Sequence, residues 1–319
     1  TGKPGVAFVT RGPGACHASI GVHIAKQDST PMVLFVGQVA TKMYGKESFQ
    51  EIDYVSMFSK VAKKSFQISK VESIEKLIHK AFQISNSGRK GPVVIALPED
   101  ILVKTTMQQN LSVFHIKKAM VNKDQILKIK SLLELSKKPL IILGGTNWSE
   151  NSKKNIKSFV KKNNLPVVTS FRRQDLIDNR CKNYVGTLGT SVSPKLLSAF
   201  KEADLILSIG SRLSDMSTNS FKLFNKSSEK TKLIQIYPNF KEIEKVFNAE
   251  LYIETDINYF ANKIFKFDWF NSEKWGNWLK RLRKEYIDDI LIKEDYNNHL
   301  LATICSKINR YINDETIIT

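Results

Sequence analysis

The first 39 residues hold the feature that most constrains the fold, an apolar segment followed by a glycine-rich turn and a helical pattern. Residues 5–9 are apolar and β-branched, as in a buried strand, and the turn at 12–14 has the sequence Gly-Pro-Gly. Such a turn is tight and allows another group to approach the backbone closely. Apolar residues recur at helical spacing over 15–26, and 32–36 is a second apolar segment. We therefore predict a strand–helix–strand unit of a parallel sheet, a fold that binds ligands at the carboxyl ends of its strands.

The rest of the chain continues this alternation of strand-like and helical segments. Strands are expected at 92–97, 140–143, 167–170, 205–209 and 233–236, and helices at 48–65, 71–85, 125–135 and 196–201. Such alternation is typical of parallel sheets with helices on both faces. It predicts an α/β fold with two doubly wound parallel-sheet domains.

The net charge of +18 raises the question of a nucleic-acid partner. The lysines are scattered over helix faces, as at Lys153, Lys157 and Lys161, and no zinc-finger spacing or aromatic-basic motif accompanies them. We interpret the charge as solvated surface, with steering of small anionic substrates as the second interpretation, and expect no nucleic-acid partner.

No apolar run approaches the roughly 18–20 residues of a membrane span, so no membrane partner is expected. Three cysteines without close pairing argue against a disulfide framework and against a zinc site. The chain starts at Thr1 inside a motif, and no signal peptide is recognised. These observations favour a cytoplasmic location.

Short blocks of the first hundred residues resemble the pyrimidine-binding domain of thiamine-diphosphate enzymes in the acetolactate synthase group. The blocks are GKPGV at 2–6, GPGA at 12–15, DSTP at 28–31, GQV at 37–39, FQE at 49–51 and GRKGPV at 88–93. The segment ADLILSIGSR at 203–212 is similar to part of the Rossmann-like central domain of the same family. The resemblance covers nearly the whole chain.

The resemblance implies a division of the chain into domains. A partial pyrimidine-binding domain is expected at 1–103, a linker at 104–121 and the central domain at 122–266. A helical connector is expected at 267–298, and the start of a third, diphosphate-binding domain at 299–319.

The first domain is implied to supply one wall of a thiamine diphosphate site. By resemblance, Gly12, Pro13, Gly14 and His17 lie against the pyrimidine ring of the cofactor. Most synthases have asparagine where this chain has His17. A structural histidine at the start of a helix is the alternative for that position.

The catalytic candidates are Gln38, Phe49 and Lys63. Gln38 and Phe49 match residues that face the substrate, and Gln38 would donate a hydrogen bond to an oxygen of the bound intermediate; otherwise it caps the end of a strand. Lys63 matches approximately a lysine at the substrate entrance, where a cation favours the carboxylate of a 2-keto acid. A solvated surface lysine is the alternative.

Other parts of the catalytic apparatus are expected outside this chain. The cofactor becomes a nucleophile when its thiazolium carbon loses a proton, which a buried glutamate beside the pyrimidine ring promotes. By resemblance, that glutamate lies upstream of Thr1, and the Mg²⁺ site for the diphosphate lies in the third domain, beyond Thr319. We therefore expect no metal site here and no activity from this chain alone.

Acetolactate synthases also bind FAD in the central domain. By resemblance, Arg89, Gly189 and Arg212 are the candidate residues for FAD or ADP. The loop after Gly189 lacks the Met-His-Gly of the synthases, and Tyr237 and Asn239 stand where acidic residues commonly lie near the adenosine. These departures predict weak or absent FAD, with an ADP-type ligand or an empty crevice as alternatives.

The function implied is that of a 2-keto acid decarboxylase and carboligase that acts on pyruvate first, most like acetolactate synthase. Glyoxylate carboligase, pyruvate oxidase, sulfoacetaldehyde acetyltransferase and a benzaldehyde-lyase-like enzyme remain open as other family members. A non-catalytic nucleotide-binding module is the alternative of another class. The resemblance also implies a homodimer or tetramer, with a regulatory subunit as a further partner.

Overall fold

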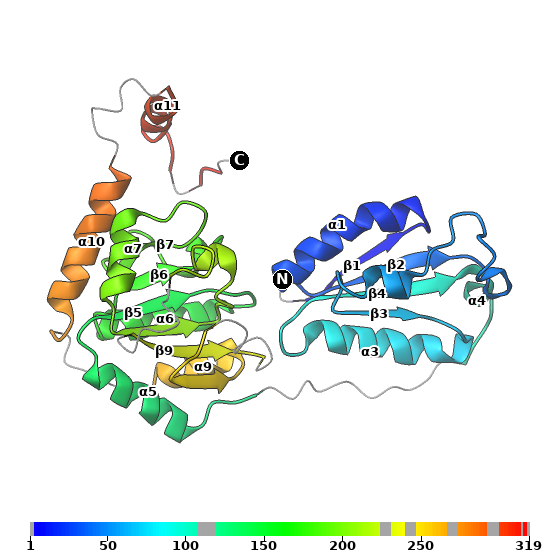
Figure 1. Cartoon of the computed structure of the whole chain (residues 1–319), viewed down its shortest axis with the longest axis horizontal. Coiled ribbons are helices and arrows are strands. Elements are labelled where there is room, and N and C mark those ends of the chain that lie inside the picture. Colours follow the sequence, from blue (N-terminus) through cyan, green and yellow to red (C-terminus); the bar gives the residue numbers. More distant parts are fainter. Residues whose placement is uncertain are drawn as a thin grey trace.

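A computed structural model describes residues 3–107, 119–223, 231–239, 247–266, 273–291, 300–313 and 315–317. It contains two sheets, each made of parallel strands and each belonging to its own α/β domain (Figure 1). The linker expected at 104–121 falls largely outside the described residues. No described helix is long and apolar enough to cross a membrane.

The first domain is a four-stranded sheet in the order β1-β2-β4-β3. Its strands are β1 (Gly5–Val9), β2 (Met32–Gln38), β3 (Lys64–Gln67) and β4 (Pro92–Pro98). Its helices are α1 (Pro13–Gln27), α2 (Tyr54–Phe58), α3 (Ile74–Asn86) and α4 (Glu99–Leu102).

Helices cover both faces of this sheet. Alternate residues of a strand point to opposite sides, and Leu34 and Val36 of β2 pack with α1 and α2. Val33 and Phe35 of the same strand pack with α3 and α4. The doubly wound arrangement predicted from the alternating segments is therefore confirmed.

The central domain is a six-stranded sheet in the order β10-β9-β8-β5-β6-β7. Its strands are β5 (Pro139–Leu143), β6 (Val167–Thr169), β7 (Tyr184–Thr187), β8 (Leu205–Ile209), β9 (Lys232–Tyr237) and β10 (Leu251–Glu254). The helices α5 (Lys123–Leu135), α6 (Glu150–Lys162) and α9 (Ile257–Ile264) cover one face, and α7 (Pro194–Glu202) and α10 (Gly276–Ile290) cover the other. A last helix is α11 (Leu300–Ile308).

The aromatic segment expected as a connector packs on the central domain in its described part. The indole N–H groups of Trp275 and Trp278 donate to the carbonyls of Ser136 and Pro139, at 3.1 and 2.9 Å. Both side chains are buried. The start of α10 is thereby anchored to the segment that leads into β5.

The helix predicted over 48–65 is wrong in its extent. Only α2 is helical there, and the chain then enters β3. Asp53 sets the start of α2, because its carboxylate accepts the backbone N–H of Ser56 at 3.0 Å. Because the helix starts only after Asp53, the residues between β2 and Asp53 form a loop at the carboxyl edge of the first sheet.

Candidate functional site

The turn after β1 lies at the carboxyl edge of the first sheet. Gly12 has a φ of +57°, a conformation that favours glycine. A Cβ at this position would lie 2.7 Å from the Cβ of Gln50. The backbone of the turn therefore packs directly against the side chain of Gln50, in the loop before α2. The N–H of Gly12 donates to the hydroxyl of Tyr54 at 2.7 Å. Pro13 then occupies the first turn of α1, where a missing N–H costs no helical hydrogen bond.

The end of β2 brings Gly37 and Gln38 next to this turn. A Cβ on Gly37 would meet the backbone nitrogen of Arg11 at 3.4 Å. Gln38 is 3% exposed, and its amide donates to the carbonyl of Ile52 at 2.8 Å. Its side-chain oxygen accepts the N–H of Val39 at 2.9 Å. In the described chain, the polar atoms of Gln38 therefore hold the start and end of the loop between β2 and α2.

Two of the expected cofactor residues, Pro13 and His17, and the expected substrate-side residue Phe49 are exposed. Pro13 and His17 lie in the first turns of α1, and Phe49 is 77% exposed. The N-terminus of α1 carries unpaired backbone N–H groups.

An ion pair that the sequence did not reveal crosses this edge. Arg11 Nη1 lies 2.7 Å from Glu99 Oε2, although the residues are 88 positions apart. Next to Glu99, the carboxylate of Asp100 accepts the backbone N–H and the hydroxyl of Thr41, at 2.9 and 2.7 Å. Both acids begin α4, directly after β4. The sequence places both acids directly after an expected strand, which could have marked them as edge residues. It could not identify their partners, Arg11 and Thr41, which come from distant segments.

Lys63 lies at the opposite edge of the first sheet, directly before β3. Its amine donates to the carbonyls of Ile84 and Ser87 at the end of α3, at 2.5 and 2.6 Å. Burial lowers the pKa of Lys63 to about 8, and the nearby Arg89 adds to this shift. The structure therefore does not bring Lys63 beside Gln38 and Gly12 within this chain.

Arg89 lies at the same amino edge as Lys63. Its guanidinium donates to the carbonyl of Lys26 at 2.6 Å and to the hydroxyl of Ser29 at 3.0 Å. Arg212, in the loop after β8, donates to the side chain of Gln27 at 3.3 Å. Both arginines of the expected nucleotide site therefore contact the last turn of α1, and Arg89 also contacts Ser29 directly after it.

The amino edge of the first sheet faces the carboxyl edge of the central sheet (Figure 1). Thr146, in the loop after β5, donates to the carbonyl of Ser29 at 3.3 Å. Lys90 donates to the side chain of Asn147 at 3.0 Å. The two domains therefore meet where the central sheet would be expected to bind a ligand.

The loops after β5 and β8 touch each other at this place. A Cβ on Gly145 would lie 2.1 Å from the carbonyl oxygen of Gly210, and one on Gly210 would lie 2.5 Å from that of Gly144. Gly189, after β7, is similarly close, because its Cβ would meet the ring of Phe171 at 2.9 Å. These glycines are required by contacts within the chain.

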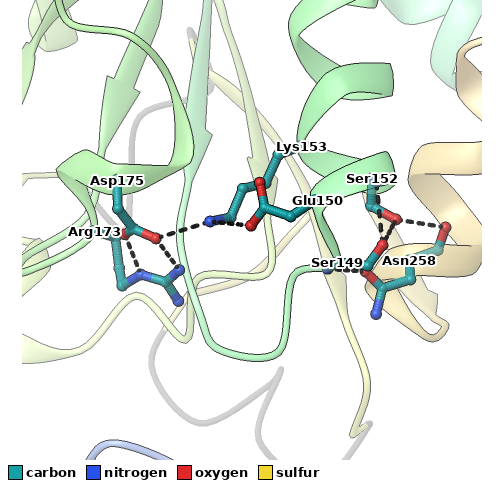
Figure 2. A network of polar contacts seen from close by, with 7 residues as sticks. All are labelled: Ser149, Glu150, Ser152, Lys153, Arg173, Asp175 and Asn258. Carbon is teal, nitrogen blue, oxygen red and sulfur yellow. Dashed lines mark hydrogen bonds and ion pairs between the residues drawn. The ribbon is translucent and has the colours of Figure 1, made fainter. Parts of the chain in front are cut away.

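A hydrogen-bond network fixes the loop after β5 (Figure 2). Ser149 caps α6, and its backbone N–H donates to the side-chain oxygen of Asn258 at 2.8 Å. The amide nitrogen of Asn258 donates to the carbonyl of Asn147, also at 2.8 Å. The same loop that contacts the first domain is therefore held by α9 from the other side.

Ion pairs continue this network along α6 (Figure 2). Arg173 forms two hydrogen bonds with Asp175, at 2.9 and 3.1 Å. Lys153 lies 3.4 Å from Asp175 and 3.1 Å from Glu150. The charges balance within the group, so we assign it a structural role. Among the residues that the structure describes, no cluster of three His, Cys, Asp or Glu side chains could hold a metal ion.

Two family models match the chain in order. Residues 1–57 match the N-terminal TPP binding domain of thiamine pyrophosphate enzymes, and residues 126–264 match the central domain of these enzymes. TPP, thiamine pyrophosphate, is thiamine diphosphate. Both matches fall on the domains described above.

Several curated relatives carry names of one activity. The acetolactate synthase large subunit of Buchnera aphidicola from Schizaphis graminum is 36% identical over 70% of this chain and 40% of its own length. A probable acetolactate synthase large subunit of Methanococcus aeolicus is 31% identical over 100% of this chain and 57% of its own. The acetolactate synthase isozyme 3 large subunit of Escherichia coli is 34% identical over 69% of this chain and 39% of its own length. This chain therefore spans about half the length of these relatives, or less.

Proposed function

Because this chain belongs to the thiamine pyrophosphate enzymes, we propose that it forms part of the large, catalytic subunit of an acetolactate synthase. The reaction joins two pyruvate molecules into 2-acetolactate and releases one CO₂. The observation that carries the proposal is the ordered match to two domains of one enzyme family, together with relatives of that single name from bacteria and an archaeon. A non-catalytic nucleotide-binding module has no such support.

The test uses the intact protein that contains this chain. It is assayed with pyruvate, thiamine diphosphate and Mg²⁺, and 2-acetolactate is identified as the product. Omission of thiamine diphosphate is the control. Assays with glyoxylate, sulfoacetaldehyde or benzaldehyde, and with pyruvate plus an electron acceptor, separate the other activities of the family. Product from one of these alone would replace acetolactate synthase as the function.

Thiamine diphosphate, when bound, supplies the carbon nucleophile that attacks the keto group and stabilises the charge left by decarboxylation. In the first domain, Gly12, Pro13, Gly14 and His17 would lie against the pyrimidine ring of the cofactor. The hydrogen bond from Gly12 to Tyr54 keeps that turn in place. Gln38 and Phe49 would lie on the substrate side, and Mg²⁺ would accompany the diphosphate.

We also propose that the central domain binds FAD weakly or not at all, because the residues present fit it poorly. The guanidinium of Arg89 is engaged by Lys26 and Ser29. The turn that precedes Arg89 lies against the end of β9, where a Cβ on Gly88 would be 3.5 Å from the carbonyl oxygen of Pro238. The closeness of the first domain to Pro238 and Asn239, next to the expected adenosine position, supports this part of the proposal.

The absence of flavin is tested on the intact protein purified without added cofactor. We expect a colourless protein whose melting temperature does not change with FAD or with ADP. Stoichiometric yellow flavin would overturn this part of the proposal. A rise in melting temperature with ADP alone would instead identify an ADP-type ligand.

Assembly and location complete the proposal. The relatives are named large subunits, which supports a regulatory subunit as a partner, and we propose a homodimer or tetramer of the intact protein. The three cysteines carry free thiols, which supports the cytoplasm or another reducing compartment. We expect no activity from this chain alone, because it spans 57% or less of the relatives named above.

A further inference from the structure

The ion pair between Arg11 and Glu99 has an unusual position in the first sheet. Arg11 follows β1 and Glu99 follows β4, and the strand order places β2 between these two strands. The pair therefore spans the carboxyl end of β2, where Gly37 approaches the backbone of Arg11. It crosses the edge that also holds the turn of Gly12 and the loop of Phe49.

Its contacts leave most of the guanidinium available. An arginine has five N–H donors, and within the described part of the chain Glu99 accepts from one of them, at 2.7 Å. The Arg11 side chain is 28% exposed and that of Glu99 is 58% exposed. Exposed ion pairs of this kind contribute little to stability, so Glu99 can leave without a large cost to the fold.

Neighbouring acids differ from Glu99 in this respect. Asp100 is held by Thr41, and Glu51 accepts backbone N–H groups of Gly45 and Ser48, at 2.6 and 3.0 Å. These carboxylates fix loops of the chain. Glu99 instead places an exposed carboxylate on one N–H of the partly buried Arg11.

We propose that Arg11 binds the carboxylate of the 2-keto acid substrate, and that Glu99 occupies this position in the resting protein. The inference rests on the proposed function, which supplies the substrate class. A planar guanidinium matches a carboxylate with two parallel hydrogen bonds, whereas Glu99 makes one. The substrate therefore gains a second hydrogen bond when it replaces Glu99, and no covalent bond changes in this exchange.

The test compares steady-state kinetics of variants of the intact protein with pyruvate. Arg11→Gln is expected to raise KM about tenfold or more, as for the loss of hydrogen bonds to a charged group. Arg11→Lys keeps the charge and should raise KM less. Glu99→Gln removes the competing carboxylate and should lower KM about two- to fivefold, the range of an exposed ion pair. In the double variant with Arg11→Gln, the Glu99→Gln substitution should not change KM further.

Arg173→Gln is the matched control, because it removes an arginine from an arginine–aspartate pair in the central domain. It should leave KM at the wild-type value. Thiamine diphosphate affinity is measured in parallel, to show that Arg11→Gln does not act through the cofactor. An active wild type whose KM is unchanged by Arg11→Gln, or raised by Glu99→Gln, would overturn the inference alone. A wild type without activity on any 2-keto acid would overturn the proposed function and this inference together.

Discussion

The backbone N–H of Gly12 donates a 2.7 Å hydrogen bond to the hydroxyl of Tyr54, which lies 42 positions later in the chain. Tyr54 is fully buried, and burial raises the pKa of its hydroxyl. The Tyr54 side chain therefore connects the start of α2 with the turn after β1, which is proposed to face the cofactor.

Tyr54→Phe should leave the Gly12 N–H without its partner. A buried unsatisfied donor costs about 1–3 kcal/mol, so the free energy of unfolding should fall by that amount. We also expect weaker thiamine diphosphate binding by the intact protein. Urea unfolding and calorimetric titration measure the two effects. A stable variant with unchanged cofactor affinity would show that this hydrogen bond does not position the turn.

Gly12→Ala should be more damaging than a glycine substitution in the helix that follows. The alanine must adopt a positive φ, which costs about 1–3 kcal/mol, and its Cβ would press on Gln50. Gly21→Ala is the control, because its Cβ meets nothing within 4 Å and α1 should gain about 0.5–1 kcal/mol. The melting temperatures of both variants test the prediction. An equal change in melting temperature for Gly12→Ala and Gly21→Ala would contradict it.

Gln38→Ala should lower turnover more than it weakens thiamine diphosphate binding. Gln38 lies at the carboxyl end of β2; one N–H of its amide donates to Ile52 at 2.8 Å, and the other reaches Gln67 at 3.4 Å. The second N–H would turn from Gln67 to the reacting oxygen, and its loss would cost about 2–4 kcal/mol in the transition state. Gln67→Leu removes the amide that lies 3.4 Å from that of Gln38, and it controls for structural effects. If both variants lose stability but keep their turnover, Gln38 serves only to hold the loop through Ile52 and Val39.

Lys63 should make the stability of the protein depend on alkaline pH. Burial lowers its pKa from 10.5 to about 8, so between these values the unfolded chain binds a proton that the native chain does not. Stability contributed by Lys63 therefore rises with pH across this window and is constant below it. Relative to Lys63→Met, the wild type should gain up to about 3 kcal/mol from pH 8 to 10.5.

Urea unfolding of both proteins at several pH values measures this gain. Lys64→Met, at the exposed neighbouring position, is the matched control. If the free energy of unfolding of the wild type falls relative to that of Lys63→Met as pH rises, the amine is not desolvated in the folded state. The neutral amine still has two N–H donors for the carbonyls of Ile84 and Ser87.

The interior strands of both sheets could be predicted from the sequence, because each is mostly apolar. The strands that were missed, β3, β7 and β10, are all edge strands. Edge strands are short and carry polar residues on their open side, as in the sequence KSFQ of β3. A hydrophobic pattern therefore did not separate these three from loops, whereas the apolar edge strand β1, GVAFV, could be predicted.

The glycine turn of the candidate site could be predicted, because Gly12 and Gly14 mark a local backbone requirement. The partners of that turn could not. Tyr54 and Glu99 reach it from segments 42 and 88 positions away, and only the strand order β1-β2-β4 brings them together. For Lys63, the sequence identified a cation but not the edge of the sheet on which it lies. The roles assigned to Gln38, Phe49, Lys63 and His17 stay predictions.

The ratio of pyruvate consumed to CO₂ released tests whether the intact protein is a thiamine-diphosphate-dependent acetolactate synthase. Pyruvate and CO₂ are followed together, with and without thiamine diphosphate. We expect two pyruvate molecules to be consumed for each CO₂, in a reaction that stops when the cofactor is omitted. One pyruvate for each CO₂, or consumption that does not require thiamine diphosphate, would contradict it.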